Sequence, residues 1–325
     1  MATVTYLEAI SIGLREEMKR DPNVFLIGED IGIYGGAFKV TKDFITEFGP
    51  ERVMDTPISE AGIIGVCVGS ALMGLRPVAE MQFADFISCG FNQMVNQAAK
   101  IHYRWGEPVP MVVRCPSGGG VHGGPFHSQN PEAWFFHVPG LKIVAPSTPY
   151  DAKGLIKAAI RDNNPVLYFE HKFLYRRIKG EIPDDDYIVP IGKGDIKREG
   201  KDMTVVAYGS AVHWALEAGE QIEKEDGVKV EVLDLRSILP YDKELITESV
   251  KKTNRVIVAH EDCLSWGYGA EIVARIANEL FSSLDAPVGR VAALDTWVAY
   301  HPQLEYEILP QVENLVKEAE RLLAY

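Results

Sequence analysis

The sequence has few cysteines and a shortage of basic residues. Four cysteines are spread over 325 residues and form no CxxC pair, and no histidine stands at metal-ligand spacing from them. A structural zinc site or a disulfide framework is therefore not expected. The formal net charge is −13 at pH 7, which argues against nucleic acid or an anionic membrane as the main partner.

Long apolar runs are missing as well. No segment is apolar over the length that a membrane-spanning helix needs. The first residues, MATVTYLEAISIGLREEMKRD, have the pattern of an amphipathic helix and lack the basic start, apolar core and small-residue cleavage site of a signal peptide. We therefore expect a cytoplasmic protein with no membrane partner.

The chain does contain a repeated alternation of short apolar runs and helical patterns. Such alternation, with strands that are apolar on both faces, predicts parallel sheets covered by helices on both sides. We therefore expect an α/β protein with two doubly wound domains. The expected strands lie near residues 24–27, 52–55, 77–83, 111–114, 141–144 and 166–170, and again near 204–208, 228–233, 256–261 and 288–292.

A charged segment with prolines and glycines, residues 171–202, separates these two series of strands. This composition is typical of a connector between domains. We expect the first domain at residues 1–185, the connector at 186–201 and the second domain at 202–325.

One helix has clear signals at both ends. Thr148 is the expected N-cap, Pro149 suits the first helical position, and Asp151 suits the positive end of the helix dipole. The string DNN at residues 162–164 is typical of a turn that ends a helix. Its oxygens could alternatively hold a hard cation.

A glycine-rich loop, Cys115–Asn130, follows one of the expected strands and has no helical or strand period. Loops of this length are usually functional or disordered, and α/β proteins place their sites at the ends of parallel strands. Gly118, Gly120 and Gly123 match GxGxxG, but a proline follows and no apolar helix begins, so we expect no dinucleotide site. His127 is the stronger candidate, either as a proton carrier or as a loop histidine bonded to backbone.

Glu60 is a second candidate, because it stands in the first turn of an expected helix with apolar residues after it. A carboxylate at this position can simply complement the helix dipole. Alternatively, the apolar neighbours Ile63, Ile64 and Val66 could desolvate it, raise its pKa and suit it to sharing a proton with a ligand nitrogen.

Two phenylalanines, Phe83 and Phe86, lie after another expected strand. They can belong to the core or form an aromatic wall for a planar ring ligand, at which Gln82 could form a hydrogen bond.

Six motifs occur in order over essentially the whole chain. They are GED at Gly28–Asp30, DTPISEAG at Asp55–Gly62, GLRPVAEMQFADF at Gly74–Phe86, HSQ at His127–Gln129, PGLKIVAPSTPYDAKGLIKAAIRDNNPV at Pro139–Val166 and EVLDLRSILPYD at Glu231–Asp242. Together they resemble the beta subunit of the thiamine-diphosphate-dependent 2-oxoacid dehydrogenases. The resemblance implies a pyrimidine-binding transketolase-like domain followed by a transketolase C-terminal domain.

The resemblance also implies roles for individual residues. Glu60 matches the glutamate that hydrogen-bonds the aminopyrimidine ring nitrogen of thiamine diphosphate and so promotes removal of the thiazolium proton. Phe86 matches the aromatic residue beside the pyrimidine, with Gln82 and Ile58 nearby. His127 matches the histidine implicated in proton handling and in passing the acyl group to lipoyl-lysine.

A family site for a structural potassium ion, largely made of backbone carbonyls, is matched by five positions. These are Met111, Ala159, Ile160, Asp162 and Asn164.

The diphosphate and magnesium motif of thiamine enzymes, GDG followed by a distant asparagine, does not occur. The nearest string, Gly194-Asp195-Ile196, lacks the second glycine. The resemblance implies that an alpha subunit supplies these contacts and holds the magnesium, with two alpha and two beta chains in the assembly. We expect this chain to be inactive alone and to share thiamine diphosphate with the alpha subunit.

The implied activity is oxidative decarboxylation of a 2-oxoacid, with reductive acylation of lipoyl-lysine on a dihydrolipoyl acyltransferase. This acyltransferase is therefore an expected partner, docking around the C-terminal helix that ends at Tyr325. The strings PSGGGVHGGPFHSQ and FHSQNPEAWFFH are closer to the branched-chain members, so a branched-chain 2-oxoacid is the expected substrate.

Other functions stay open from the sequence. Pyruvate and acetoin dehydrogenase beta subunits share the motifs. A self-contained transketolase-like enzyme would need the missing GDG motif. A non-catalytic scaffold subunit would require Glu60 and His127 to be dispensable.

Overall fold

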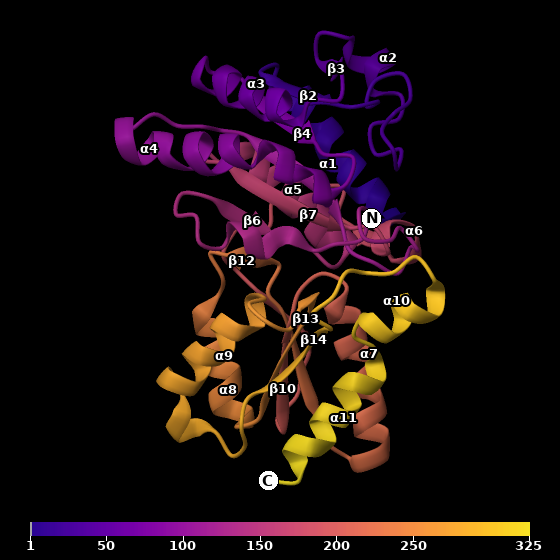
Figure 1. The fold of residues 1–325 in the computed structure, drawn as a ribbon, viewed down its shortest axis with the longest axis vertical. Coiled ribbons are helices and arrows are strands. Elements are labelled where there is room, and N and C mark those ends of the chain that lie inside the picture. Colours follow the sequence, from indigo (N-terminus) through magenta and orange to yellow (C-terminus); the bar gives the residue numbers. More distant parts are fainter. Residues whose placement is uncertain (1) are drawn as a thin grey trace. The chain divides into compact units, whose positions relative to one another are not determined.

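The computed structural model describes residues 2–325, which divide into two compact units (Figure 1). The first unit comprises residues 2–117 and Trp134–Ile191, and the second comprises Gly118–Ala133 and Gly192–Tyr325. Over residues 2–325, the structure contains no helix with the length and apolar character needed to cross a membrane.

The sheet of the first unit is built from parallel strands in the order β6-β7-β5-β4-β2-β3. Of its central strands, β2, β5 and β7 are buried along their whole length and β4 is buried from its second residue on, as their continuous apolar runs predict. The strands are β2 (Val24–Gly28), β3 (Val53–Asp55), β4 (Arg76–Glu80), β5 (Val112–Ser117), β6 (Lys142–Val144) and β7 (Val166–His171).

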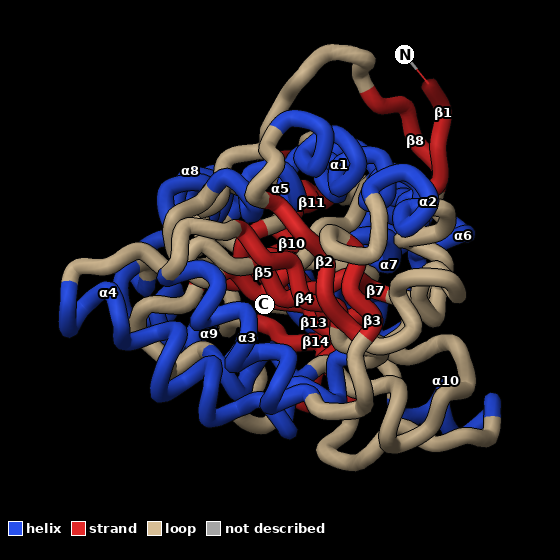
Figure 2. The backbone as a smooth tube through the Cα atoms, turned by 90° about the horizontal axis from the view of Figure 1, so that it is seen from above, coloured by secondary structure: helices blue, strands red, loops and turns tan. Residues whose placement is uncertain are grey.

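Helices cover both faces of this sheet, with α1 (Tyr6–Arg20) and α5 (Pro149–Arg161) on one face and α3 (Glu60–Leu72) on the other (Figure 2). Gly13 allows the close approach of α1 and α5, because a Cβ there would lie 2.5 Å from Ile156 Cγ2. The other elements of this unit are β1 (Ala2–Thr5), α2 (Phe44–Phe48), η1 (Ala84–Gly90), the π-helical η2 (Gln93–Ala98), α4 (Ala99–Trp105), α6 (Leu174–Arg177) and β8 (Lys179–Ile182).

The expected signals of α5 are confirmed. The side chain of Thr148 accepts a hydrogen bond from the backbone N–H of Asp151, Pro149 is the first helical residue, and the helix ends at Arg161 with Asp162 as its C-cap. The DNN string is therefore the turn that the sequence predicted.

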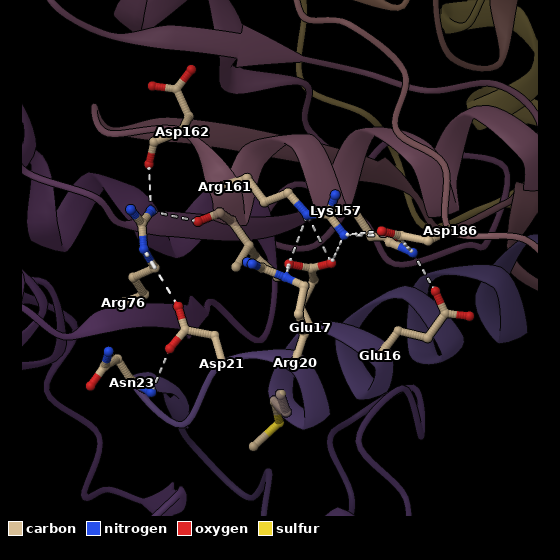
Figure 3. A network of polar contacts seen from close by, with 12 residues as sticks. Glu16, Glu17, Arg20, Asp21, Asn23, Arg76, Lys157, Arg161, Asp162 and Asp186 are labelled. Atoms are coloured by element: carbon tan, nitrogen blue, oxygen red, sulfur yellow. Dashed lines mark hydrogen bonds and ion pairs between the residues drawn. The ribbon is translucent and has the colours of Figure 1, made fainter.

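A network of ion pairs joins α1 to α5 (Figure 3). Glu17 is fully buried and accepts hydrogen bonds from Arg161, the shortest from Nη2 at 2.7 Å. Lys157, also buried, pairs with Glu16 and with Asp186, whose carboxylate lies 2.6 Å from its Nζ. These paired charges fix the register of the two helices, because removing one partner would leave the other buried and unpaired.

The second unit contains a sheet of strand order β14-β13-β10-β11-β9. All its neighbouring pairs are parallel except β11 with β9, which is antiparallel. The elements of this unit are β9 (Asp195–Arg198), β10 (Met203–Ala207), α7 (Ala211–Asp226), β11 (Val230–Asp234), β12 (Ser237–Leu239), α8 (Lys243–Thr253), β13 (Val256–Cys263), α9 (Tyr268–Glu279), η4 (Phe281–Ser283), β14 (Gly289–Ala293), α10 (Pro302–Ile308) and α11 (Val312–Leu323).

Two features were not expected from the sequence. The glycine-rich segment Gly118–Ala133 groups with the second unit, although it leaves and re-enters the first. Within the segment expected to be a connector, β9 forms an edge strand of the second sheet. Both depend on partners far away in the sequence, which local patterns do not reveal.

Candidate active site

Polar side chains gather where β2 and β4 end. Asp30 follows β2 and Gln82 follows β4, and the two strands pair in parallel, so their carboxyl ends share one edge of the sheet. The amide Nε2 of Gln82 donates a hydrogen bond to Asp30 Oδ2 at 3.2 Å. Gln82 thus lies at the edge at which open α/β sheets bind ligands.

Glu60 is the first residue of α3 and is half buried. Its carboxylate therefore stands at the positive end of the helix dipole. Of the apolar residues expected beside it, Ile63 and Ile64 are buried, whereas Val66 is 49% exposed. The expected apolar face is only partly formed, and Ile58, just before the helix, is 82% exposed.

Glu29 is a second carboxyl group near Glu60, and sequence reasoning missed it as a site residue. It is buried at the end of β2. Burial raises its pKa, and the neighbouring charges of Glu60 and Asp30 raise it further. Neighbouring carboxyl groups with different burial are a common way to separate two proton affinities. The available signal was the GED string itself, which puts a carboxyl group at a strand end.

Phe83 and Phe86 are half buried, so neither is a full core residue. Their ring centroids are 5.9 Å apart in an edge-to-face arrangement. Phe83 also packs edge-on against Phe38 at 5.4 Å, and Lys172 Nζ lies 5.7 Å from its centroid. This partly exposed ring pair offers the apolar surface that a planar ligand needs.

His127 lies in the glycine-rich loop of the second unit and is half buried. Its backbone N–H donates to the carbonyl of Gly124 at 3.2 Å, and the backbone N–H of Gly118 donates to the carbonyl of Gln129 at 3.1 Å. The glycines of the GxGxxG match lie in irregular structure, and the next helical element is the short η3 (Pro131–Phe135). Backbone hydrogen bonds thus join the two ends of the loop and form a turn at Gly124–His127, with His127 half buried.

The end of this loop is held by a buried carboxyl group. Tyr208 Oη donates a hydrogen bond to Glu132 Oε1 at 2.7 Å. Burial raises the pKa of Glu132 to about 8, and the charge of Asp262 adds to the effect. Glu132 therefore holds a proton more strongly than an exposed glutamate.

At four of the five positions expected to bind potassium, the backbone carbonyl already accepts a hydrogen bond. The carbonyl of Met111 accepts from the N–H of Val166, and that of Ala159 accepts from the N–H of Asp162. Arg76 Nη1 donates to the carbonyls of Ile160 at 2.9 Å and Asp162 at 3.0 Å (Figure 3).

Side chains at this turn are paired as well. The carboxylate of Asp162 forms an ion pair with Lys142 and accepts from the backbone N–H of Asn164 at 2.8 Å. The guanidinium of Arg76 therefore takes the position of a cation at the carbonyls of Ile160 and Asp162, and the potassium site stays a prediction.

The chain matches two domain families along its length. Residues 2–177 match the transketolase pyrimidine binding domain, and residues 192–315 match the transketolase C-terminal domain. These matches confirm the expected fold class, two α/β domains in this order.

Whole-length relatives are beta subunits of dehydrogenases. The 2-oxoisovalerate dehydrogenase subunit beta of Bacillus subtilis is 53% identical over 308 residues, which are 94% of each chain. The pyruvate dehydrogenase E1 component subunit beta is 43% identical in Staphylococcus epidermidis and 42% identical in Staphylococcus aureus, in each case over 327 residues and 100% of both chains.

A solved structure shows the same fold. It is described as a split gene transketolase in an inactive beta4 tetramer, and it superposes with a TM-score of 0.79 at 23% identity, covering 99% of this chain and 98% of that one. With the two domain matches and the whole-length relatives, the chain belongs to the transketolase-like family of 2-oxoacid dehydrogenase E1 beta subunits.

Proposed function

We propose that this chain acts on a branched-chain 2-oxoacid, as the beta subunit of the decarboxylating component. The observation that carries the proposal is the identity of 53% to the 2-oxoisovalerate relative, against 43% and 42% to the pyruvate relatives. Pyruvate is the second candidate substrate, because the pyruvate relatives match over their whole length.

The proposed reaction is decarboxylation of the 2-oxoacid, followed by reductive acylation of lipoyl-lysine on a dihydrolipoyl acyltransferase. In that second step the lipoyl disulfide is the two-electron oxidant: it opens to a dithiol, one sulfur of which carries the acyl group. Family membership implies thiamine diphosphate as the cofactor. When bound, it supplies the carbon that adds to the 2-oxo group and the electron sink for loss of carbon dioxide.

The residues at the strand ends fit the aminopyrimidine ring of this cofactor. Phe83 and Phe86 offer ring surface, and Gln82 offers an amide at the same edge of the sheet. Glu60 offers a half-buried carboxylate, which would hold the proton shared with a ring nitrogen. Ile58 adds an exposed apolar contact beside it.

His127 is proposed to handle protons at the reacting centre and to assist transfer of the acyl group to lipoyl-lysine. An imidazole is suited to this task because its ordinary pKa lies near neutral pH. Its support is the loop geometry, which presents a half-buried histidine on a closed turn.

An alpha subunit is proposed to supply the diphosphate and magnesium contacts, in an assembly of two alpha and two beta chains. Two observations support this. The sequence has no GDG motif, and the first unit exposes large apolar side chains that a partner would cover, among them Ile33 at 90%, Met73 at 83% and Tyr103 at 96%.

The acyltransferase is proposed to dock beside the C-terminal helix. A groove of about 570 Å³ lies between β14, α10 and α11, with Lys317 and Arg321 of α11 in its lining. Deleting the last residues, up to Tyr325, should weaken binding of the acyltransferase in a pull-down. Unchanged binding would place the docking surface elsewhere.

Potassium is not part of the proposal, because Arg76 already donates hydrogen bonds to the carbonyls of Ile160 and Asp162. Replacing sodium by potassium in the buffer should leave the melting temperature of the chain unchanged. A rise specific to potassium would restore the ion that the family resemblance implied.

Calorimetry of thiamine diphosphate and magnesium binding tests the proposed half-site. The chain is titrated alone and then with its co-expressed alpha subunit. Tight binding in the mixture alone is expected, with faster turnover of 3-methyl-2-oxobutanoate than of pyruvate. Tight binding by the isolated chain would favour a self-contained transketolase-like enzyme, and faster turnover of pyruvate would favour the second substrate.

A further inference from the structure

The loop around His127 has many backbone donors and little regular structure to satisfy them. Residues 118–130 lie outside helices and strands. Ordering such a glycine-rich segment is entropically costly, and buried N–H groups need acceptors. Carboxylates from distant elements of the second unit provide them.

Glu305 is the main acceptor for the first half of the loop. It is 2% exposed and lies on α10. One carboxylate oxygen accepts from the backbone N–H of Gly120 at 2.9 Å, and the other accepts from the backbone N–H of His122 at 3.2 Å and lies 2.5 Å from His122 Nδ1. Among residues 2–325, the carboxylate of Glu305 forms hydrogen bonds with this loop alone.

Glu261, at the end of β13, joins both ends of the loop. Its Oε1 accepts from the backbone N–H of Gly119 at 2.6 Å and from Asn130 Nδ2 at 3.0 Å. Its Oε2 accepts from Ser210 Oγ at 2.8 Å, which fixes the carboxylate itself.

Side chains next to α10 also pack against the loop at two of its glycines. A Cβ at Gly124 would lie 2.2 Å from the ring of Tyr300, and one at Gly119 would lie 2.5 Å from Leu309 Cδ1. The segment from Tyr300 to Leu309 therefore holds the loop by packing and by the carboxylate of Glu305.

We propose that Glu305 is a positioning residue for His127. Its carboxylate fixes the loop from Gly120 to His122, and the turn from Gly124 to His127 continues from that anchor. The imidazole of His127 is thereby held where the acyl group is transferred. The inference rests on the proposed role of His127. It states that Glu305 affects acylation only by holding that histidine in place.

A double-mutant cycle on the assembled alpha–beta enzyme tests the inference. Glu305→Gln keeps the shape of the side chain but removes the charge and one acceptor. Reductive acylation of a lipoyl domain should fall by roughly 10- to 100-fold, since a misplacement of about 1 Å can cost about 100-fold. In a His127→Ala background, the same change should have an effect of less than about 2-fold, because the group it positions is gone.

Glu220→Gln is the matched control, because it makes the same chemical change at an exposed glutamate of α7 in the same unit. Its substitution should leave both backgrounds unchanged.

Each outcome decides the matter. A full effect of Glu305→Gln in the His127→Ala background, or no effect in either, would overturn the positioning role. If His127→Ala itself leaves acylation unchanged, the proposed role of His127 fails, which is a separate result from failure of Glu305.

A second variant covers the case in which Glu305→Gln does not fold. His122→Asn removes the imidazole partner from an exposed position and keeps a residue that tolerates the φ of 59° found there. The expected loss of acylation is smaller, about 3- to 10-fold, and it too should vanish in the His127→Ala background. Hydrogen exchange of the loop amides should become faster in this variant, and unchanged exchange and unchanged acylation together would contradict the inference.

Discussion

The start of α3 and the His127 loop differ in how much of their surroundings the chain itself supplies. Glu60 stands half buried at a helix end, next to exposed Ile58. The loop has acceptors for its donors within its own chain, in the buried carboxylates of Glu261 and Glu305. The comparison teaches that this chain anchors the backbone of the His127 loop with its own carboxylates but leaves the surroundings of Glu60 partly exposed.

The largest loss of activity is expected from a substitution of Glu60, at the partly exposed start of α3. Glu60→Gln keeps the shape of the side chain but removes the proton that a carboxyl group can share, so decarboxylation by the assembled enzyme should fall by about 100- to 10,000-fold. The melting temperature should hardly change, because the side chain has few partners in the first unit. The rate is measured with an artificial electron acceptor.

The control is Glu244→Gln, a change in the first turn of α8 at a side chain that is 83% exposed. It should leave the rate unchanged. Full activity of Glu60→Gln would favour a scaffold subunit.

In the His127 loop, an added side-chain atom should destabilise the protein through a steric clash. Gly124 has a φ of +70°, and an added Cβ would lie 2.2 Å from the ring of Tyr300. Gly124→Ala should therefore cost about 1–2 kcal/mol for the backbone alone, and more for the contact. Acylation should fall along with stability in chemical denaturation.

A glycine of α3 provides the contrast. Gly65 has no atom within 4 Å of its added Cβ, so Gly65→Ala should stabilise the isolated chain by about 0.5–1 kcal/mol. If both substitutions have the same sign, the distinction between an open and an enclosed region is wrong.

A pH dependence of stability is expected at the end of the loop. The pKa of Glu132 is raised from 4.5 to about 8 by burial and by Asp262. The stabilisation from its neutral form is complete below the unfolded value of 4.5 and is lost as pH rises through about 8.

Glu132→Gln, which is neutral throughout, should flatten this fall in stability. Denaturation midpoints between about pH 5 and 8 measure it. The exposed Glu225→Gln should keep the parental slope, and a parental slope in the Glu132 variant would contradict the assignment.

Local signals in the sequence were sufficient for the α/β alternation and for the ends of α5. Thr148, Pro149 and Asp151 act within one helical turn, so their pattern determines the local structure without help from distant residues. The comparisons confirm the family that the motifs implied.

Long-range partners could not be predicted in the same way. The acceptors of the loop lie 142 and 185 residues further along the chain, and Arg76 reaches the turn after α5 across 86 residues. Glu29 was missed because its raised pKa depends on burial and on Glu60, which only the folded chain brings together. The roles of Glu60 and His127 and the domain limits at 185 and 202 stay predictions.

During synthesis, the loop emerges before the residues that accept its hydrogen bonds. The ribosome makes Gly118–Ala133 well before it makes Glu261 and Glu305, which satisfy the donors of the loop. The sheet strands on either side of this segment can pair while its glycines still lack their acceptors. The loop around His127 should therefore become ordered only after Glu305 of α10 has been translated. An incomplete nascent chain can then hold a folded first unit while this loop is still disordered.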